Sequence, residues 1–257
     1  MRPWPSARRR SSGAPVPSAM AISCSSPGST ASATWRSSCS SRIPRSPASS
    51  ARSGRRRRAG ALKDGHFLLK SGRHSERYLE KFLLLQDPAV TSELCAFWAA
   101  AARGANGEPL VDVVAGPTTG GIVLAFETAR QLGVRGIFAE EVRDADGTTR
   151  RAFRRGFAIE PGERVLLVDD ILTTGGSLLA MLPPVEAAGG EIVGCLIMAD
   201  RSGGTAVLAS PSTGRRYPVQ GLWQLEIPTF EPGAATCPRC ADGTPLYAPG
   251  STGTGAG

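Results

Sequence analysis

The first 63 of the 257 residues contain no acidic side chain, although they hold 13 of the chain's 30 lysines and arginines. The other 17 basic residues are outnumbered by the 22 acidic ones, so the rest of the chain has a net charge of −5. The overall charge of +8 therefore belongs to the leading segment. For this reason the charge does not predict a nucleic-acid-binding protein, and we expect no nucleic-acid partner.

Long apolar runs and a regular cysteine framework are also missing. No apolar stretch approaches the ~18 residues that cross a bilayer, so we expect no membrane association. The six cysteines are irregularly spaced, which argues against a secreted fold built on disulfides. Because the apolar content is ample for a core, we expect a soluble, cytoplasmic protein.

Residues 1–58 lack aliphatic periodicity and consist mainly of Ser, Arg, Ala, Pro and Gly. Such a segment buries too little surface to offset its ordering entropy, which predicts disorder. A transit peptide, a basic nucleic-acid arm, and a misassigned start or out-of-frame stretch all remain as explanations, although no amphipathic stripe supports the first. We expect one domain over residues 59–248 and a flexible tail over residues 249–257.

In the stretch from Arg164 to Ser177, an apolar run is followed from Asp169 onward by mostly polar residues and glycines. Apolar residues 165–168 predict a strand buried on both faces, and the carboxylates of Asp169 and Asp170 follow at its end. A polar loop then leads into a helical apolar pattern, through Ile171, Leu172, Thr173, Thr174, Gly175, Gly176 and Ser177. Glycines, hydroxyls and first-turn amides suit a phosphate, whereas paired acids suit sugar hydroxyls or a divalent cation. This stretch predicts a site for a phosphorylated sugar, with magnesium as the cation.

A second strand, loop and helix precede this one. Residues 110–115 predict a buried strand, residues 116–121 a Gly/Thr loop, and residues 122–132 a helix. A second anion-binding loop at the same sheet edge is what a diphosphate requires. Strands and helices alternate from Leu110 to Ala199, which predicts an α/β fold with an open, mostly parallel, doubly wound sheet.

The remaining chain adds a helix and further strands. A helix begins at Asp87-Pro88, with an N-cap acceptor followed by proline. Further strands are expected over residues 134–139 and 191–199, and a short one within residues 217–230. The charged residues 140–155 predict either a solvated hairpin or a mobile catalytic flap.

The run from Val168 to Ser177 resembles the phosphoribosyl pyrophosphate (PRPP) binding motif of the type I phosphoribosyltransferases over its full length. The resemblance implies that Asp169 and Asp170 hold the ribose hydroxyls at the catalytic centre, while residues 171–177 bind the rest of the sugar phosphate. It also implies a pyrophosphate loop formed by Thr119, Gly120 and Gly121. Many members carry lysine where this chain has Gly120, so that lysine contact is missing here.

The run Phe67–Ser75 resembles the N-terminal hood segment of the orotate phosphoribosyltransferases, where Phe-x-Leu-Lys-Ser-Gly-Arg-x-Ser is characteristic. The resemblance implies that Lys70 contacts PRPP, and that Arg201, with Thr173, binds orotate. A guanidinium fork suits a planar carboxylate, although an Asp200–Arg201 turn pair is the other interpretation of that dipeptide. The implied reaction converts PRPP and orotate to orotidine 5′-monophosphate and pyrophosphate, with Mg²⁺ carried by PRPP, in a homodimer.

Two other functions remain open at this point. A phosphoribosyltransferase for another base would share every phosphate contact, and a non-enzymatic PRPP-sensing regulator would share the fold. The flap and the missing lysine keep the regulator open, because the family's Arg-Lys-x-x-Lys-x-His pattern is absent and Glu140 and Glu141 stand where its basic pair would begin. Arg151, Arg154 and Arg155 are the candidates to replace these basic residues.

Cys237 and Cys240 have the spacing of half a zinc knuckle. A structural zinc ion needs two more ligands, and the sequence shows neither a second cysteine pair nor a neighbouring histidine. We therefore expect no metal ion held by the protein itself, unless two copies of the chain pair their cysteines in a dimer. The histidines, His66 and His74, are expected to have positional rather than catalytic roles.

Overall fold

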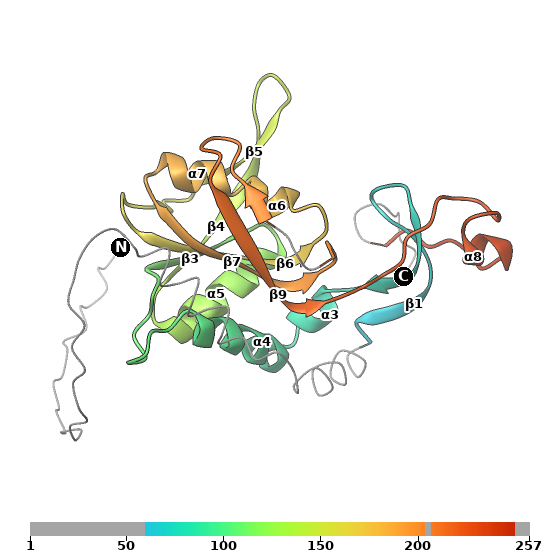
Figure 1. Ribbon diagram of the computed structural model, residues 1–257, viewed down its shortest axis with the longest axis horizontal. Helices are drawn as coiled ribbons and strands as arrows, with labels where there is room; N and C mark the ends of the chain where they lie inside the picture. Colours follow the sequence, from blue (N-terminus) through green and yellow to red (C-terminus); the bar gives the residue numbers. More distant parts are fainter. Residues whose placement is uncertain (1–59, 204–206, 250–257) are drawn as a thin grey trace, which may run out of the picture. The chain divides into compact units, whose positions relative to one another are not determined.

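The computed structural model describes residues 60–203 and 207–249. The predictions for residues 1–58 and for nearly all of the tail lie outside these ranges. The described chain contains a hairpin of β1 (Leu62–Leu68) and β2 (His74–Leu79), and a seven-stranded sheet in the order β5-β4-β3-β6-β7-β9-β8 (Figure 1). The sheet strands are β3 (Val113–Pro117), β4 (Arg135–Arg143), β5 (Thr149–Phe153), β6 (Arg164–Leu172), β7 (Glu191–Asp200), β8 (Val207–Ala209) and β9 (Arg216–Gln224).

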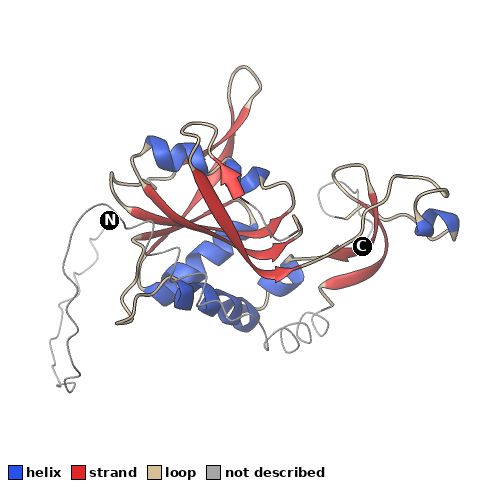
Figure 2. Cartoon of the chain, in the orientation of Figure 1, coloured by secondary structure: helices blue, strands red, loops and turns tan. Residues whose placement is uncertain are grey.

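The sheet is mostly parallel, as predicted. Strands β4, β3, β6, β7 and β9 run parallel, and only the edge strands β5 and β8 are antiparallel to their neighbours. Helices lie on both of its faces (Figure 2). These helices are α3 (Phe82–Leu85), α4 (Pro88–Ala101), α5 (Gly120–Leu132), α6 (Gly176–Leu179) and α7 (Leu182–Ala187). None of the described helices is long and apolar enough to cross a membrane.

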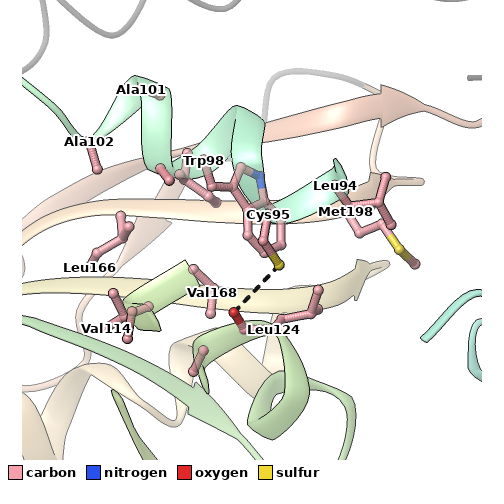
Figure 3. Packing of buried hydrophobic residues seen from close by; sticks show 14 of the residues in the cluster. Leu94, Cys95, Trp98, Ala101, Ala102, Val114, Leu124, Leu166, Val168 and Met198 are labelled. Carbon is pink, nitrogen blue, oxygen red and sulfur yellow. Dashed lines mark hydrogen bonds between the residues drawn. The ribbon is translucent and has the colours of Figure 1, made fainter. Parts of the chain in front are cut away.

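Strand β6 is buried on both faces because its side chains alternate between two cores. Leu166 and Val168 pack in the core between the sheet and helices α4 and α5, where Trp98 is fully buried (Figure 3). Val165 and Leu167 face the other core, to which α6 and α7 contribute. All four residues of the apolar run over positions 165–168 are 0% exposed. The continuous apolar run therefore corresponds to a central parallel strand.

Helix α4 begins where the sequence predicts. The Asp87 carboxylate accepts hydrogen bonds from the backbone N–H groups of Ala89 at 2.9 Å and Val90 at 3.3 Å. Pro88 follows at the first helical position, where its missing N–H costs nothing. The helix then buries one face, including Cys95 and Trp98.

The helical pattern after the phosphate loop is divided into α6 and α7. Helix α6 ends at Leu179 and α7 begins at Leu182. Pro183 and Pro184 have no N–H groups to donate to the carbonyls one turn earlier, which disfavours continuing α6 through them, whereas in the first turn of α7 these N–H groups are not needed. The expected strand over residues 110–115 also begins later, at Val113.

The order of the strands creates a crevice at the carboxyl edge of the sheet. Strand β4 pairs with one side of β3, and β6 pairs with the other side. The connections that leave β3 and β6 therefore diverge at this point, and the loops that follow these strands face each other. Ligands of doubly wound sheets bind in such a crevice, and both anion loops predicted from the sequence lie there.

The C-terminal segment is fastened to the β1–β2 hairpin. The backbone of Tyr247 pairs with β1, and the backbone of Phe230 pairs with His74 on β2. The short helix α8 (Pro238–Ala241) lies between these two contacts in sequence. This arrangement brings His66 and His74 beside Cys237 and Cys240. The expectation that no histidine neighbours the cysteine pair is wrong. The fold brings His66 next to Cys237 although the two residues are 171 positions apart in the sequence, so local spacing gave no sign of the contact.

Candidate active site

The two acidic residues of β6 lie at its carboxyl end and are both buried, with Asp169 6% and Asp170 4% exposed. The Asp169 carboxylate accepts a hydrogen bond from the backbone N–H of Asp170 at 2.8 Å. Burial, and then the neighbouring charge of Asp170, raises the pKa of Asp169 to about 7. Asp169 faces the phosphate loop, whereas Asp170 faces Lys81 and Gly120.

The predicted phosphate loop encloses a pocket of about 200 Å³. Its lining consists of Asp169 and of residues that sequence reasoning assigned to the sugar phosphate, followed by the first apolar residue of α6: Ile171, Leu172, Thr173, Thr174, Gly175, Gly176, Ser177 and Leu178. Gly175 has a φ of +81°, and a Cβ atom there would lie 2.7 Å from the Leu208 side chain. A glycine is therefore required, and backbone amides and hydroxyls are left as the donors for an anion.

The predicted pyrophosphate loop lies against Asp170. A Cβ atom on Gly120 would overlap the Asp170 carboxylate, one on Gly116 would overlap the backbone of Gly121, and one on Gly121 would overlap the ring of Pro117. The Thr118–Thr119 peptide is cis. The lysine that the resemblance places at residue 120 would therefore have no room on this backbone.

An arginine from β5 reaches the same loop. The Arg151 guanidinium donates to the Thr118 hydroxyl at 2.6 Å, and its side chain is only 11% exposed. Strands β4 and β5 form the antiparallel hairpin that the sequence predicted for residues 140–155. On this hairpin Arg155 is paired with Glu140. Arg151 is therefore the cation that the fold brings to the pyrophosphate loop.

Lys81 belongs to the site, although sequence reasoning missed it. Its Nζ lies 2.6 Å from Oδ2 of Asp170, and its side chain is 31% exposed. Nothing in the local sequence distinguishes this residue from a surface lysine, since its partner is 89 positions away. Lys70, the lysine that the sequence assigned to PRPP, is exposed on the turn between β1 and β2 and does not line the phosphate pocket.

Arg201 directly follows the end of β7 and lies beside the end of β6. Its backbone N–H donates to the Leu172 carbonyl at 2.8 Å, which joins it to the end of β6. Its Nε is buried without a hydrogen-bond partner among the described residues, and burial lowers the pKa of the guanidinium. Asp200 accepts hydrogen bonds from Ser202 instead, at 2.7 and 2.6 Å. The Asp200–Arg201 turn pair considered from the sequence is therefore not formed.

The raised pKa of Asp169 predicts that Asp169→Asn stabilises the protein at pH 8. Folded Asp169 holds its proton up to about pH 7, whereas the unfolded chain releases it near 4. Wild-type stability therefore falls as the pH rises through this window, whereas asparagine avoids the buried charge and still accepts the Asp170 N–H bond. We expect a gain on the order of 2 kcal/mol at pH 8, narrowing below pH 7.

Thermal unfolding at pH 8 and pH 5 measures this effect. Asp112→Asn is the control, because a hydrogen bond from Arg164 lowers the pKa of Asp112 and its loss should destabilise the protein at pH 8. A gain in stability for Asp169→Asn that does not change with pH would contradict the raised pKa of Asp169.

Comparisons with known proteins agree with this geometry. The family model for the phosphoribosyl transferase domain matches residues 86–216. The orotate phosphoribosyltransferase of Pelotomaculum thermopropionicum is 41% identical over 76% of this chain and 93% of its own length. That of Caldicellulosiruptor bescii is 43% identical over 74% of this chain and 91% of its own.

A solved structure shows the same fold. The orotate phosphoribosyltransferase of Mycobacterium tuberculosis H37Rv, in complex with inorganic phosphate, superposes with a TM-score of 0.50 at 24% identity. The match covers 70% of this chain and 97% of that one. The family model and the two relatives show that the chain belongs to the orotate phosphoribosyltransferase family of phosphoribosyl transferase domain proteins, and the two acids of β6 and the paired loops agree with this.

Proposed function

We propose that the protein transfers the phosphoribosyl group of PRPP to N1 of orotate, giving orotidine 5′-monophosphate and pyrophosphate for pyrimidine synthesis. One observation carries the proposal: the buried, unpartnered Arg201 Nε lies one residue past β7, next to the strand whose acids and loop suit a sugar phosphate. A guanidinium in that position suits the carboxylate of orotate.

The reaction breaks the bond between ribose C1 and the diphosphate oxygen and forms a bond from C1 to N1 of orotate, which has lost its proton. Positive charge develops on the ribosyl carbon while negative charge grows on the leaving diphosphate. The buried carboxylate of Asp170 favours the first charge, and Arg151 with the amides of the Gly120–Gly121 turn favours the second. The β4–β5 hairpin is the element suited to cover the ligands and exclude water.

Magnesium is part of the proposal as an ion that arrives with PRPP. The carboxylate oxygens of Asp169 and the hydroxyls of Thr173 and Thr174 line the pocket and are the hard donors that Mg²⁺ prefers. When bound, the ion neutralises charge on the diphosphate. We expect EDTA to abolish turnover and added Mg²⁺ to restore it.

A base panel tests the proposed function. Purified protein is incubated with PRPP, Mg²⁺ and either orotate, uracil, adenine or hypoxanthine, and consumption of the base is followed by absorbance. Turnover of orotate alone is the expected result. Turnover of another base in place of orotate would identify a different transferase, and PRPP binding without any turnover would identify a regulator.

A homodimer is proposed because α5 presents an exposed apolar face. Phe126 is 66% and Val123 is 39% exposed, and the two residues lie one turn apart. We expect a dimer in size-exclusion chromatography with light scattering, and a monomer for Phe126→Asp. Val207→Asp, at a similarly exposed position on β8, should leave the dimer intact. A wild-type monomer at all concentrations would contradict the proposal.

The proposed location is the cytoplasm. The four cysteines among the described residues are free thiols, and two of them, Cys95 and Cys195, are buried in the cores. A reducing compartment keeps such thiols in this state.

A further inference from the structure

Four side chains with metal-binding atoms meet where the C-terminal segment crosses the β1–β2 hairpin. His66 lies on β1, His74 begins β2, and Cys237 and Cys240 lie at the start and in the third position of α8. One ligand atom from each residue lies within 4.8 Å of the other three. Cys237 is 0%, His66 4% and His74 6% exposed, and Cys240 is partly buried, so most of the cluster is shielded from solvent. This part of the structure is not used by the proposed reaction.

The distances are close to those of a tetrahedral zinc site. Zinc with two sulfur ligands at about 2.3 Å and two nitrogen ligands at about 2.0–2.1 Å places its ligand atoms about 3.3–3.8 Å apart. Nε2 of His66 lies 3.6 Å from each of the two sulfurs, and Nδ1 of His74 lies 3.2 Å from Sγ of Cys240. The two ring nitrogens are 2.8 Å apart, a separation that a small rotation of either imidazole increases.

A backbone contact sets the tautomer of His66. Its Nδ1 lies 2.8 Å from the carbonyl oxygen of Thr244, which can only accept a hydrogen bond, so Nδ1 carries the proton. The lone pair of a neutral ring is then on Nε2, the atom that faces His74 and both cysteines. Histidine ligands of zinc have such a partner on the other nitrogen.

Hydrogen bonds within this cluster do not satisfy all four of its side chains. Nδ1 of His74 and the sulfurs of Cys237 and Cys240 all lie near Nε2 of His66, at 2.8, 3.6 and 3.6 Å, and Sγ of Cys240 also lies 3.2 Å from Nδ1 of His74. Each ring nitrogen has at most one lone pair for a donor, so in either tautomer of His74 at least one of these contacts is left without a hydrogen bond. A cation bound by all four atoms satisfies every member at once.

We propose that His66, His74, Cys237 and Cys240 form a structural Zn²⁺ site that fastens the C-terminal segment to the β1–β2 hairpin. The donor set of two thiolates and two imidazoles, with the Cys-x-x-Cys spacing, suits zinc and leaves no open position for catalysis. This inference does not depend on the reaction proposed above, because none of the four residues contacts the phosphate loops.

The hairpin needs such a fastening because it has little core of its own. A two-stranded hairpin is marginally stable alone, and the rings that cover this one are Phe67, Tyr78 and Tyr247, of which Tyr247 is 49% exposed. The proposed ligands His66 and His74 lie on either side of the turn over residues 69–73. Strand β2 ends at Leu79, two residues before Lys81, whose ammonium group pairs with Asp170. The metal would hold both strands in register beside the site.

Metal content tests the proposal directly. The full chain, purified under reducing conditions without chelator and dialysed, is analysed by inductively coupled plasma mass spectrometry, with one zinc per chain expected. Cys240→Ser should lose the zinc, whereas Cys240→His should keep it because the ligand number is preserved. Cys95→Ala, a buried cysteine elsewhere, should also keep it. A different metal at this stoichiometry, or zinc retained by both Cys237→Ser and Cys240→Ser, would overturn the proposal.

A second measurement applies to variants that fold poorly. Wild-type protein stripped of metal and titrated with Co²⁺ should develop the intense visible bands of tetrahedral cobalt with thiolate charge transfer, and Zn²⁺ should displace them. Limited proteolysis should then cut the segment after residue 230 faster in the stripped protein than in the zinc-loaded one. Absence of the cobalt bands in a stripped but folded chain, or a Cys237–Cys240 disulfide found in the reduced preparation, would also overturn the proposal.

Discussion

Replacing Asp170 by asparagine is expected to lower kcat by about 100- to 1000-fold while the protein remains folded. The Asp170 carboxylate is 4% exposed, so its charge acts on the ribosyl centre with little screening by water. Asparagine has the same shape and retains the backbone N–H bond to Asp169, but it removes the negative charge. Lys81, the present partner of Asp170, is 31% exposed and remains hydrated in the variant.

Initial rates at saturating PRPP and orotate measure this effect, with circular dichroism as the check on folding. Glu163→Gln is the matched control, because Glu163 is a carboxylate that pairs with Arg135 and precedes β6 at the end opposite to Asp170. We expect that control to keep its kcat. A folded Asp170→Asn enzyme with the wild-type kcat would show that this charge does not stabilise the transition state.

The parts of the site that come from consecutive residues could be predicted from the sequence. Residues 165–177 form a strand, a pair of acids and a glycine loop within one βα unit, so local pattern was sufficient to identify them. The second loop, at residues 116–121, was also found, and the alternation of strands and helices predicted the parallel sheet that places both loops at one edge.

The parts that come from distant segments could not be predicted. Lys81 reaches Asp170 from the end of the β1–β2 hairpin. Arg151 was among the flap candidates named from the sequence, but its contact with Thr118, past the intervening strand β4, could not be predicted. The clearest case is the cysteine pair, whose histidine neighbours are supplied by backbone pairing of the C-terminal segment with β1 and β2. Periodicity reports which face of one element is buried, and it carries no information about which elements meet.

We expect the identity of the base to depend on one partly buried cation, Arg201, more than on the loops. The fold and the phosphate contacts are compatible with transfer to any nucleobase, because ribose, phosphate and diphosphate are common to all such reactions. Arg201 differs from them, since its partly buried guanidinium has no acidic partner among the described residues and its Nε makes no hydrogen bond. A buried charge without a partner is costly, and an anionic base removes that cost on binding.

Arg201→Gln is therefore expected to raise the KM for orotate by about 100-fold, which corresponds to about 2.7 kcal/mol, while the KM for PRPP changes little. Glutamine keeps polar donors but loses the charge and the two-point fork for a carboxylate. Arg216→Gln, at an exposed position on β9, is the matched control and should keep both constants. If both KM values rose together, Arg201 would be maintaining the site as a whole. A selective rise for orotate is the result that assigns the base to this residue.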